Sequence, residues 1–415
     1  MNYLFIVTES RSANGICTKA IMERLAESHC VYCITNREDG QGPAYQQGSV
    51  QYYTVRPRLV YSMASRLAQR DAPSARAKAE RVALFIINKL KLILTAPIWP
   101  LISPLYANRL YRTARSVCRK QSIDCIVPVY TQIDTLIAAC RIKKRFRSIQ
   151  YVPYFLDSLS GGYGPRYFTK DWIRRQGLRW EHLLLPEADH IIAMESSRRH
   201  HRAYSSRMVY YDRIHFLDLP LLTAPNPEAA LGPDLMDPHQ INLVYVGTLP
   251  NGIRSPEYVL KVFSHIRDQR WQLYFVGEDG HEKLNFAARQ DPRIHVIGRV
   301  SHETALRYEA QASALVNIGN RNPNMVPSKI FEYFSWGKPI VSTAASGDEP
   351  SIPYLRRYPR VLILDETAPD PGAEAERLVA FIDAARGASI CPSVIQKEFY
   401  SNTPEATVAF LQEIR

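Results

Sequence analysis

The sequence lacks both an uninterrupted apolar run long enough to cross a membrane and an N-terminal signal segment. In its most apolar stretch, residues 82–106, Lys89 and Lys91 interrupt the run and three prolines break its second half. A spanning helix needs about 20 mostly apolar residues. Met1 is followed at once by a predicted strand, residues 3–8, with no basic segment ahead of it. We therefore expect a cytoplasmic protein without a spanning helix.

The sequence also lacks a metal-binding or disulfide pattern. Cys30 and Cys33 lie in a predicted strand, where residues three apart point to opposite faces, and no second ligand pair has a spacing suited to zinc. His190, expected within a strand, and the neighbouring His200 and His201 have no carboxylates at metal-binding spacing. We therefore expect buried free thiols and no metal site.

Acidic residues are scarce in one region, whereas basic residues are abundant across the first half. Residues 51–150 contain 19 Lys and Arg but only four acidic residues. The net charge of +12 divides into +16 for residues 1–224 and −4 for residues 225–415. This imbalance predicts an anionic partner for the first half. No helix-turn-helix, zinc-finger, RNP or KH signature is present, so we expect no nucleic acid partner.

The apolar stretch and its basic flanks favour an anionic membrane surface, through about residues 76–120. An apolar helix beside cationic side chains can lie in the headgroup region, with lysines reaching back to water. A buried core helix followed by a solvated, arginine-rich helix is the alternative. The flanking cations are Arg76, Lys78, Arg81, Arg109, Arg112, Arg115, Arg119 and Lys120.

Strand and helix patterns alternate in both halves of the chain, which is typical of parallel sheets covered by helices. We predict an N-terminal Rossmann-like domain over residues 1–222 and a second over 241–399. The segment 223–240 has the proline-rich composition of a linker. A last helix, about 400–415, is expected to pack back on the first domain.

The stretch 314–343 is where the sequence points most clearly to a ligand. A buried strand, 314–318, is followed by a loop and by a helix expected to start at 326–328, with proline at its first position. Gly337 is expected to end the helix before a strand at 340–343. Helix N-termini at the carboxyl edge of a parallel sheet favour phosphate. Glu332, about one turn into the helix, would reach the ribose of a nucleotide.

The block PSKIFEYFSWGKPIV, residues 327–341, resembles the nucleotide-sugar site of retaining GT-B glycosyltransferases, in particular glycosyltransferase family 4. The family pattern is an acidic residue, seven others, a glutamate, and a Gly-x-Pro turn before a β-branched strand. The resemblance implies two doubly wound parallel-sheet domains facing a central cleft. An ordinary connection between helix and strand that happens to carry Glu, Gly and Pro is the alternative.

Carried onto this sequence, the resemblance implies a diphosphate site after the first strand of the second domain. Gly247 matches the family's glycine and Arg254 falls at the position of its lysine, whereas Thr248 stands where an arginine is usual. A guanidinium can hold two phosphate oxygens at once. Lys329, beside Ser328 at the helix entry, is expected to supply the second cation.

The resemblance also implies contacts to the sugar and the base of the donor. Glu332 would hold the ribose, and Asn324 occupies the position of the family's first carboxylate, which contacts the transferred sugar. Arg299 and Val300 belong to a segment similar to the one whose backbone reads the base. Asparagine keeps hydrogen-bonding capacity without charge.

On the acceptor side, the turn at Gly15 resembles the glycine turn between the first strand and helix of GT-B enzymes. Family 4 enzymes often carry a histidine at the end of a later strand; here Leu156 takes that position and Asp157 follows. Asp157 is therefore the expected acid/base candidate. A residue that only caps the loop is the alternative.

We expect a retaining hexosyltransferase that moves sugar from a UDP- or GDP-sugar to a lipid-linked or saccharide acceptor in surface polysaccharide synthesis. Asp157, Arg254 and Lys329 are the expected catalytic residues. No D-x-D motif is present, so we expect a metal-independent reaction without a cofactor, on the inner face of the cell membrane. A GT-B epimerase of nucleotide-sugars and a catalytically degenerate partner subunit are the alternatives. The base, the sugar, the acceptor, the linkage and the oligomeric state do not follow from the sequence.

Overall fold

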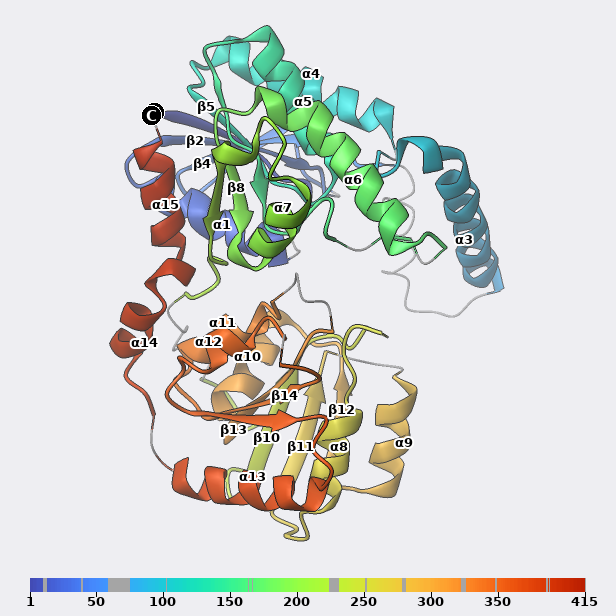
Figure 1. Ribbon diagram of the computed structural model, residues 1–415, viewed down its shortest axis with the longest axis vertical. Helices are drawn as coiled ribbons and strands as arrows, with labels where there is room; N and C mark the ends of the chain where they lie inside the picture. The colour runs from blue at the N-terminus through green and yellow to red at the C-terminus, as the bar shows by residue number, and fades with distance from the viewer. Residues whose placement is uncertain are drawn as a thin grey trace. The chain divides into compact units, whose positions relative to one another are not determined.

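The computed structural model describes the chain except residues 10–12, 39, 59–74, 102, 163, 166, 224–230, 251, 278–280, 322–325, 348, 386, 388 and 415, together with the side chains of 13, 75–79, 81, 88 and 90–92. The chain divides into two compact units, one of Met1–Leu219 with Thr407–Arg415 and one of Pro220–Ala406. Both are α/β units built on parallel sheets, as the sequence predicts (Figure 1). Part of the expected linker, 224–230, lies outside the described residues.

The first unit contains a six-stranded sheet with the order β3-β4-β2-β1-β5-β6, parallel except for the β3–β4 pair. A smaller parallel sheet, β7-β8-β9, lies in the same unit. The strands are β1 (Asn2–Ile6), β2 (Cys30–Asn36), β3 (Ala44–Gln47), β4 (Val50–Val55), β5 (Cys125–Pro128), β6 (Gln150–Tyr151), β7 (Tyr154–Phe155), β8 (Ile191–Met194) and β9 (Ile214–Leu217).

The single strand expected to lead into Asp157 is two short strands in different sheets. The Val152 amide donates to Ile126 in the first sheet, whereas the Pro153 carbonyl accepts from Ile192 in the second. Proline has no N–H to continue the ladder, so the chain changes sheets there. His190 precedes β8 and is not inside the strand as expected.

The helices of the first unit differ from the predicted bounds mainly at their ends. The first helix, which the sequence pattern predicts over about residues 16–28, starts and finishes about three residues earlier, so that Gly15 lies in its first turn. The chain's last helix returns to this unit, where the Tyr3 hydroxyl donates to the Leu411 carbonyl at 3.0 Å. The helices are α1 (Ala13–Leu25), α3 (Ala75–Thr95), α4 (Pro104–Lys120), α5 (Ile133–Arg145), α6 (Lys170–Leu184), α7 (Arg198–Tyr204) and α15 (Pro404–Glu413).

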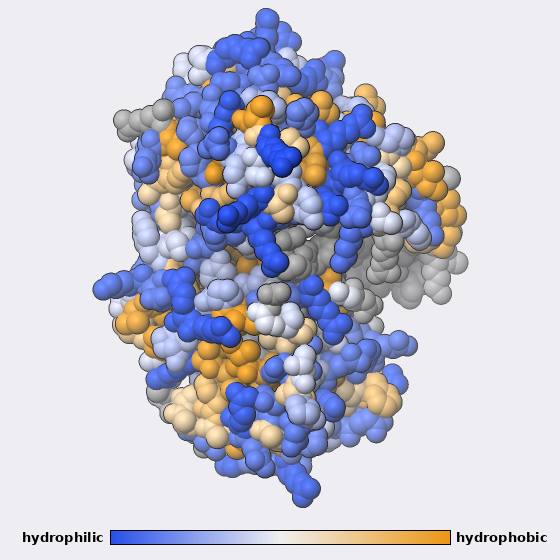
Figure 2. Space-filling view, in the orientation of Figure 1, coloured by the Kyte–Doolittle hydropathy of each residue, from blue (hydrophilic) through white to orange (hydrophobic). Residues whose placement is uncertain are grey.

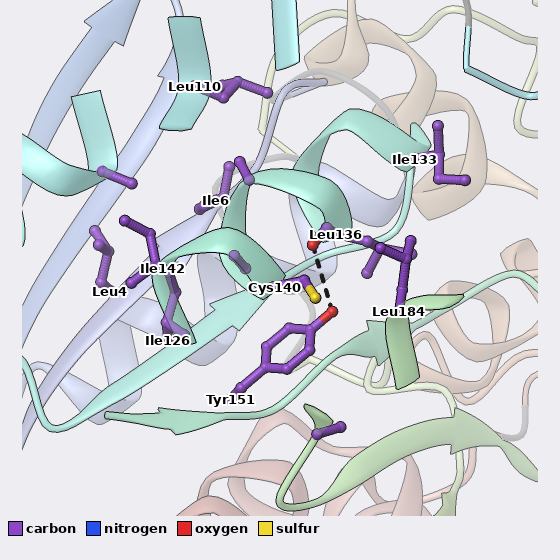
Figure 3. Packing of buried hydrophobic residues seen from close by; sticks show 14 of the residues in the cluster. Leu4, Ile6, Leu110, Ile126, Ile133, Leu136, Cys140, Ile142, Tyr151 and Leu184 are labelled. Atoms are coloured by element: carbon purple, nitrogen blue, oxygen red, sulfur yellow. Dashed lines mark hydrogen bonds between the residues drawn. The ribbon is translucent and has the colours of Figure 1, made fainter. Parts of the chain in front are cut away.

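The core of the first unit lies between β1 and β5 of the large sheet and the helices α4 and α5. Leu4, Ile126 and Ile142 are fully buried there (Figure 3). The Tyr151 hydroxyl donates to the Leu136 carbonyl at 3.4 Å across this core. Of the seven cysteines, all free, Cys33 is buried as expected but Cys30 is exposed at the start of β2.

The second unit is built on a wholly parallel sheet with the order β12-β11-β10-β13-β14-β15. Every residue of β10, β13 and β14 is buried, as is typical of a parallel sheet covered on both faces. The strands are β10 (Ile241–Val246), β11 (Trp271–Val276), β12 (Ile294–Gly298), β13 (Ala314–Ile318), β14 (Ile340–Ala344) and β15 (Val361–Asp365).

The helix predicted to begin at 326–328 starts later and is short. Its first helical residue is Lys329, with Ser328 at the N-cap and Pro327 ahead of the cap rather than inside the helix. Gly337 follows the last turn with φ of 64°, a left-handed conformation suited to glycine. The helices are α8 (Glu257–Ser264), α9 (Glu282–Gln290), α10 (His302–Gln311), α11 (Lys329–Ser335), α12 (Ile352–Leu355), α13 (Pro371–Ala385) and α14 (Pro392–Glu398).

The apolar stretch of the first unit forms α3 and a single 3-10 turn, Ala96–Ile98, before α4 begins. Figure 1 shows α3 standing apart from the sheet of its unit. Over the described part of the chain, no helix combines the length and the apolar character needed to cross a membrane.

Candidate functional site

Glycine lines the carboxyl edge of four neighbouring strands in the second unit. Gly247, Gly277 and Gly298, at the ends of β10, β11 and β12, have φ of 143°, 98° and 71°. At the end of β13, a side chain on Gly319 would lie 2.8 Å from the Thr343 carbonyl oxygen. Glycine permits both the left-handed backbone and the close approach of another group. The edge therefore presents bare backbone to a ligand.

Arg254 is held at this edge by the loop that follows β13. Its Nε donates to the Asn320 side-chain oxygen at 2.7 Å, and Nη1 makes a longer contact of 3.4 Å to the Thr248 carbonyl. The Arg321 amide donates to the Ile253 carbonyl at 3.0 Å, which joins the two loops. The guanidinium is thus fixed through its inner nitrogen, so its outer edge can contact a phosphate.

Behind Arg254 lies a buried carboxylate that the sequence analysis did not identify. Glu349 is 3% exposed and accepts from the Asn320 and Ser351 amides, each at 3.1 Å, and from the Ser351 hydroxyl. Burial raises the pKa of Glu349, while its hydrogen bonds and Arg254 oppose the rise. Glu349 follows β14, and that position at a carboxyl edge is the sequence signal that could have found it.

Lys329 and Glu332, which the resemblance assigns to the donor, are paired with each other in the structure. Lys329 Nζ lies 2.5 Å from Glu332 and 2.9 Å from Glu309, whose other oxygen accepts from Trp336 at 2.9 Å. Burial raises the pKa of the wholly enclosed Glu309 to about 8. Lys329 therefore interacts with two carboxyl groups, and its expected contact to a diphosphate stays a prediction.

The start of α11 is fixed beside the end of β10. The Tyr333 hydroxyl accepts from the Val246 amide at 2.8 Å and lies 3.3 Å from its carbonyl. This contact ties α11 to the end of β10, which Gly247 follows. The predicted diphosphate residues therefore belong to elements that meet at the carboxyl edge of this sheet.

The remaining residues predicted to bind the donor have fewer contacts that tie them to this edge. Thr248 is exposed and uses its carbonyl for Arg254, while Arg299 and Val300 follow Gly298 at the same edge, with Arg299 exposed. Asn324 lies outside the described residues. The roles assigned to these residues stay predictions.

In the first unit, Asp157 lies against the start of α1. The Asn14 side-chain amide donates to Asp157 Oδ2 at 2.9 Å, in the same turn as Gly15. Burial raises the pKa of Asp157, and this hydrogen bond opposes the rise. Leu156, at the position where the family carries histidine, is 5% exposed and belongs to the core. The structure therefore brings the two predicted acceptor-side residues together.

A buried network holds the loop that follows Asp157. Glu181, 1% exposed, accepts from the Ser160 amide at 3.1 Å and the Tyr210 hydroxyl at 3.0 Å. The Ser160 hydroxyl and His200 Nε2 lie 2.8 Å apart, and burial lowers the pKa of His200 to about 4. His200 is thus neutral at pH 7 and acts as a packing residue. No set of three or more metal-binding side chains gathers in the described part of the chain.

Comparison with known proteins agrees with this geometry. Residues 240–356 match the family model described as Glycosyl transferases group 1. A search of curated proteins gives no match. Sucrose-phosphate synthase from Thermosynechococcus elongatus superposes with a TM-score of 0.67 at 14% identity, covering 100% of this chain and 98% of that one.

Two further solved structures have the same architecture. The UDP-forming α,α-trehalose-phosphate synthase from Burkholderia xenovorans, in complex with glucose-6-phosphate, has a TM-score of 0.62 at 10% identity and full coverage of both chains. Anabaena Alr3699/HepE in complex with UDP has a TM-score of 0.57 at 11% identity, covering 100% of this chain and 99% of that one. The chain therefore has the GT-B glycosyltransferase fold, with a group 1 glycosyl transferase domain in its second unit.

Proposed function

We propose that this protein is a retaining glycosyltransferase of family 4 type that uses a nucleotide-sugar, with a UDP- or GDP-sugar as the donor. One observation carries the proposal: Arg254 is anchored by Asn320 at a carboxyl edge where Gly247, Gly277 and Gly319 expose the backbone. That edge belongs to the segment matching group 1 glycosyl transferases. The UDP in the HepE complex and the UDP-forming neighbour support a uridine donor.

In the proposed reaction, the bond between the sugar C1 and the diphosphate oxygen breaks, and the diphosphate leaves with the electron pair. The acceptor hydroxyl bonds to C1 on the face that the diphosphate leaves, and its proton passes to the departing phosphate oxygen. Negative charge on the leaving group grows during this step, so a fixed guanidinium lowers the barrier. Arg254 and Lys329 supply that charge, Glu332 holds the ribose, and Asp157 contacts the sugar. We expect activity to persist in the presence of EDTA.

A thermal-shift screen with UDP-, GDP-, ADP- and CMP-sugars tests the donor assignment. A ligand that binds the native state raises the apparent stability with the logarithm of its concentration. We expect one nucleotide to raise Tm, and the combined Arg254→Ala and Glu332→Ala variant to lose that shift. Arg270→Ala, which removes an exposed pair with Asp268 after α8, is the matched control. Full transfer activity in the combined variant would refute the assignment.

We further propose that the acceptor is carried by a membrane lipid and that α3 lies on the anionic surface, as in surface polysaccharide assembly. Val82, Phe85, Ile86 and Ile93 are each more than half exposed and fall on one side of α3, whereas Leu84 faces inward with 7% exposure. Figure 2 shows the hydrophobic atoms over α3 at the edge of the first unit. Exposed apolar patches of this kind mark interaction surfaces.

Charge near α3 points to lipid rather than to a protein groove. The Lys89 ammonium lies over the Phe85 ring at 4.6 Å and the Tyr167 ring at 5.5 Å, so a cation sits within the apolar face. The next helix carries the exposed Arg112 and Arg119. Each cation near an anionic leaflet contributes about 1 kcal/mol. The side chains of Arg76, Lys78 and Arg81 lie outside the described residues.

Co-sedimentation with vesicles tests the membrane proposal. We expect binding to vesicles containing phosphatidylglycerol, weaker binding to purely zwitterionic vesicles, and weakening by salt. Ile93→Glu with Leu94→Glu should reduce binding, because it places two charges on residues that are 68% and 79% exposed. Val209→Glu, at a residue 70% exposed in the same unit, is the control. Binding unaffected by the α3 change or by salt would contradict the proposal.

A further inference from the structure

A second polar cluster lies at the carboxyl edge of the large sheet in the first unit. Arg58 follows β4, Asn36 ends β2, Tyr106 and Arg109 lie near the start of α4, and Asp134 lies in the first turn of α5. Since α4 leads into β5 and α5 leads out of it, the start of both helices falls at the carboxyl edge. Four elements thus bring five side chains together at this edge.

Tyr106 is the centre of this cluster. Its side chain is fully buried, and its hydroxyl donates to the Asn36 side-chain oxygen at 2.6 Å. The guanidinium carbons of Arg58 and Arg109 lie 5.2 Å and 5.5 Å from the centre of its ring. Two like charges are therefore held against one aromatic ring, an arrangement in which each repels the other unless an anion lies between or beside them.

The described carboxylates offset only one of the two charges. Arg58 pairs with Asp134, whose side chain is fully buried. Arg109 makes one long hydrogen bond, 3.5 Å, to the Pro57 carbonyl, and no ion pair within the part of the chain that the structure describes. The Arg58–Asp134 pair alone can be understood as a structural contact that joins the segment after β4 to α5. It does not explain why a second arginine shares the ring.

We propose that Arg58 and Arg109, both held over the Tyr106 ring, form a phosphoryl-binding subsite on the acceptor side. Arginine binds phosphate through two parallel N–H donors, and both guanidiniums keep donors beyond the contacts above. The inference rests on the proposed function in one respect, namely that the bound phosphoryl group belongs to the acceptor. It gives the acceptor a chemical class: a phosphate or diphosphate ester, of which a lipid-linked sugar is one source.

Equilibrium binding of inorganic pyrophosphate to the full chain tests the subsite. Titrations are made with and without saturating UDP, so that a donor-side diphosphate site is filled in one arm. We expect pyrophosphate binding to remain in the presence of UDP and to weaken roughly tenfold in Arg109→Gln, because one charge-assisted pair is lost. Arg109 is half-buried on the helix surface, so the variant should fold; an unchanged Tm checks this.

Two comparisons make the outcome specific. Arg202→Gln, an exposed arginine on α7, should leave the affinity unchanged. Arg109→Lys should restore part of it, because the charge remains while the forked geometry is lost. Equal weakening in Arg109→Gln and Arg202→Gln, or loss of all pyrophosphate binding in Arg254→Ala alone, would overturn the subsite. Pyrophosphate binding that depends on Arg109 but not on UDP supports the subsite even if the donor proposal fails.

The source of the phosphoryl group is tested with two further probes. A short prenyl diphosphate below its micelle concentration should bind more tightly than pyrophosphate and should lose affinity in Arg109→Gln. Vesicles containing phosphatidylglycerol should bind this variant as they bind the unaltered protein. The reverse result, with vesicle binding lost and prenyl diphosphate binding kept, would assign Arg109 to the bilayer and overturn the acceptor assignment.

Discussion

The carboxyl edges of the two sheets are built in opposite ways. In the second unit, glycine stands at the ends of four strands, and the guanidinium of Arg254, anchored by Asn320, lies at this edge. In the first unit, the edge is filled by side chains, with Asp157 against Asn14 and two arginines against Tyr106. Backbone recognition suits a group that every donor shares, such as a diphosphate. Side-chain recognition suits the acceptor, which differs between enzymes.

The two edges also differ in how a buried carboxylate is placed relative to the arginine. Among the described residues, Glu349 makes no direct hydrogen bond to Arg254. Instead, Glu349 accepts from the Asn320 amide, and the Asn320 side-chain oxygen accepts from Arg254. Around Arg58, the carboxylate of Asp134 contacts the guanidinium directly. An arginine that contacts a carboxylate directly attracts an anionic ligand less strongly than one held by a neutral amide, because the carboxylate already offsets its charge. This difference predicts that Arg254 contributes more to catalysis than Arg58.

Arg254→Ala should have the largest effect on activity. Removing a fixed charge from the leaving group of a reaction typically costs about 10²–10³ in rate. We expect kcat/KM for transfer to fall by this order, with little change in Tm, because Arg254 is partly exposed and its loss leaves Asn320 able to bond water. Steady-state kinetics with the donor found by the nucleotide screen measures the effect. A smaller loss in Arg254→Ala than in Arg58→Ala, with Tm checked for both variants, would reverse the comparison.

Glu309→Gln should change how stability depends on pH. The pKa of Glu309 is raised to about 8 in the folded protein, so between about pH 5 and pH 8 the folded chain keeps a proton that the unfolded chain has lost. Raising the pH through this window therefore destabilises the native protein. Glutamine has no proton to lose. The stability of the variant relative to the native protein should rise steadily from pH 5 to pH 8.

Urea unfolding at several pH values measures this difference. Glutamine can still accept the hydrogen bond from Trp336, and any change in that bond shifts the stability of the variant by an amount that does not depend on pH, so only the slope is diagnostic. Glu376→Gln, on α13, controls for the removal of an acidic side chain. A constant difference in the free energy of unfolding between native protein and variant over this range would show that Glu309 is ionised throughout. Lys329 would then lie between two charged carboxylates, those of Glu309 and Glu332.

Local patterns were sufficient to predict the fold. The alternation of apolar strands and helices gave two parallel-sheet units, and the strand 314–318 was placed with its bounds. The helix after it was predicted too early, because Pro327 fits either the first helical position or the residue before the cap. The strand before Asp157 was predicted as one element, because the change of sheet depends on tertiary pairing and not on apolar pattern.

The site was predictable only where a motif stands in continuous sequence. The motif assigned Gly247, Arg254, Lys329 and Glu332 to the donor, and these roles stay predictions. Glu349 and Asn320 were missed because their importance comes from contacts between loops, which no spacing in the chain reveals. The pairing of Lys329 with the buried Glu309 was missed for the same reason.

Asn14→Ala gives the smallest effect and tests the acceptor-side edge. Asp157 has a pKa raised by burial, so if its ionised form is needed, activity should decline on the acid side at a pH above the ordinary range of an aspartate. The amide of Asn14 favours the ionised form. Its removal should raise the pKa of Asp157 further and move the acid limb of kcat/KM to higher pH.

The direction in which the acid limb of kcat/KM moves distinguishes a catalytic role of Asp157 from a purely structural one. If Asp157 only caps its loop, Asn14→Ala lowers Tm without moving the pH profile, because no titrating group then limits the rate. If Asp157 acts in its protonated form, the same variant extends activity to higher pH and leaves the acid limb in place. Asp157→Asn should remove the limb altogether under the proposed role. Only a limb that moves upward in Asn14→Ala and disappears in Asp157→Asn agrees with a carboxylate that acts on the sugar.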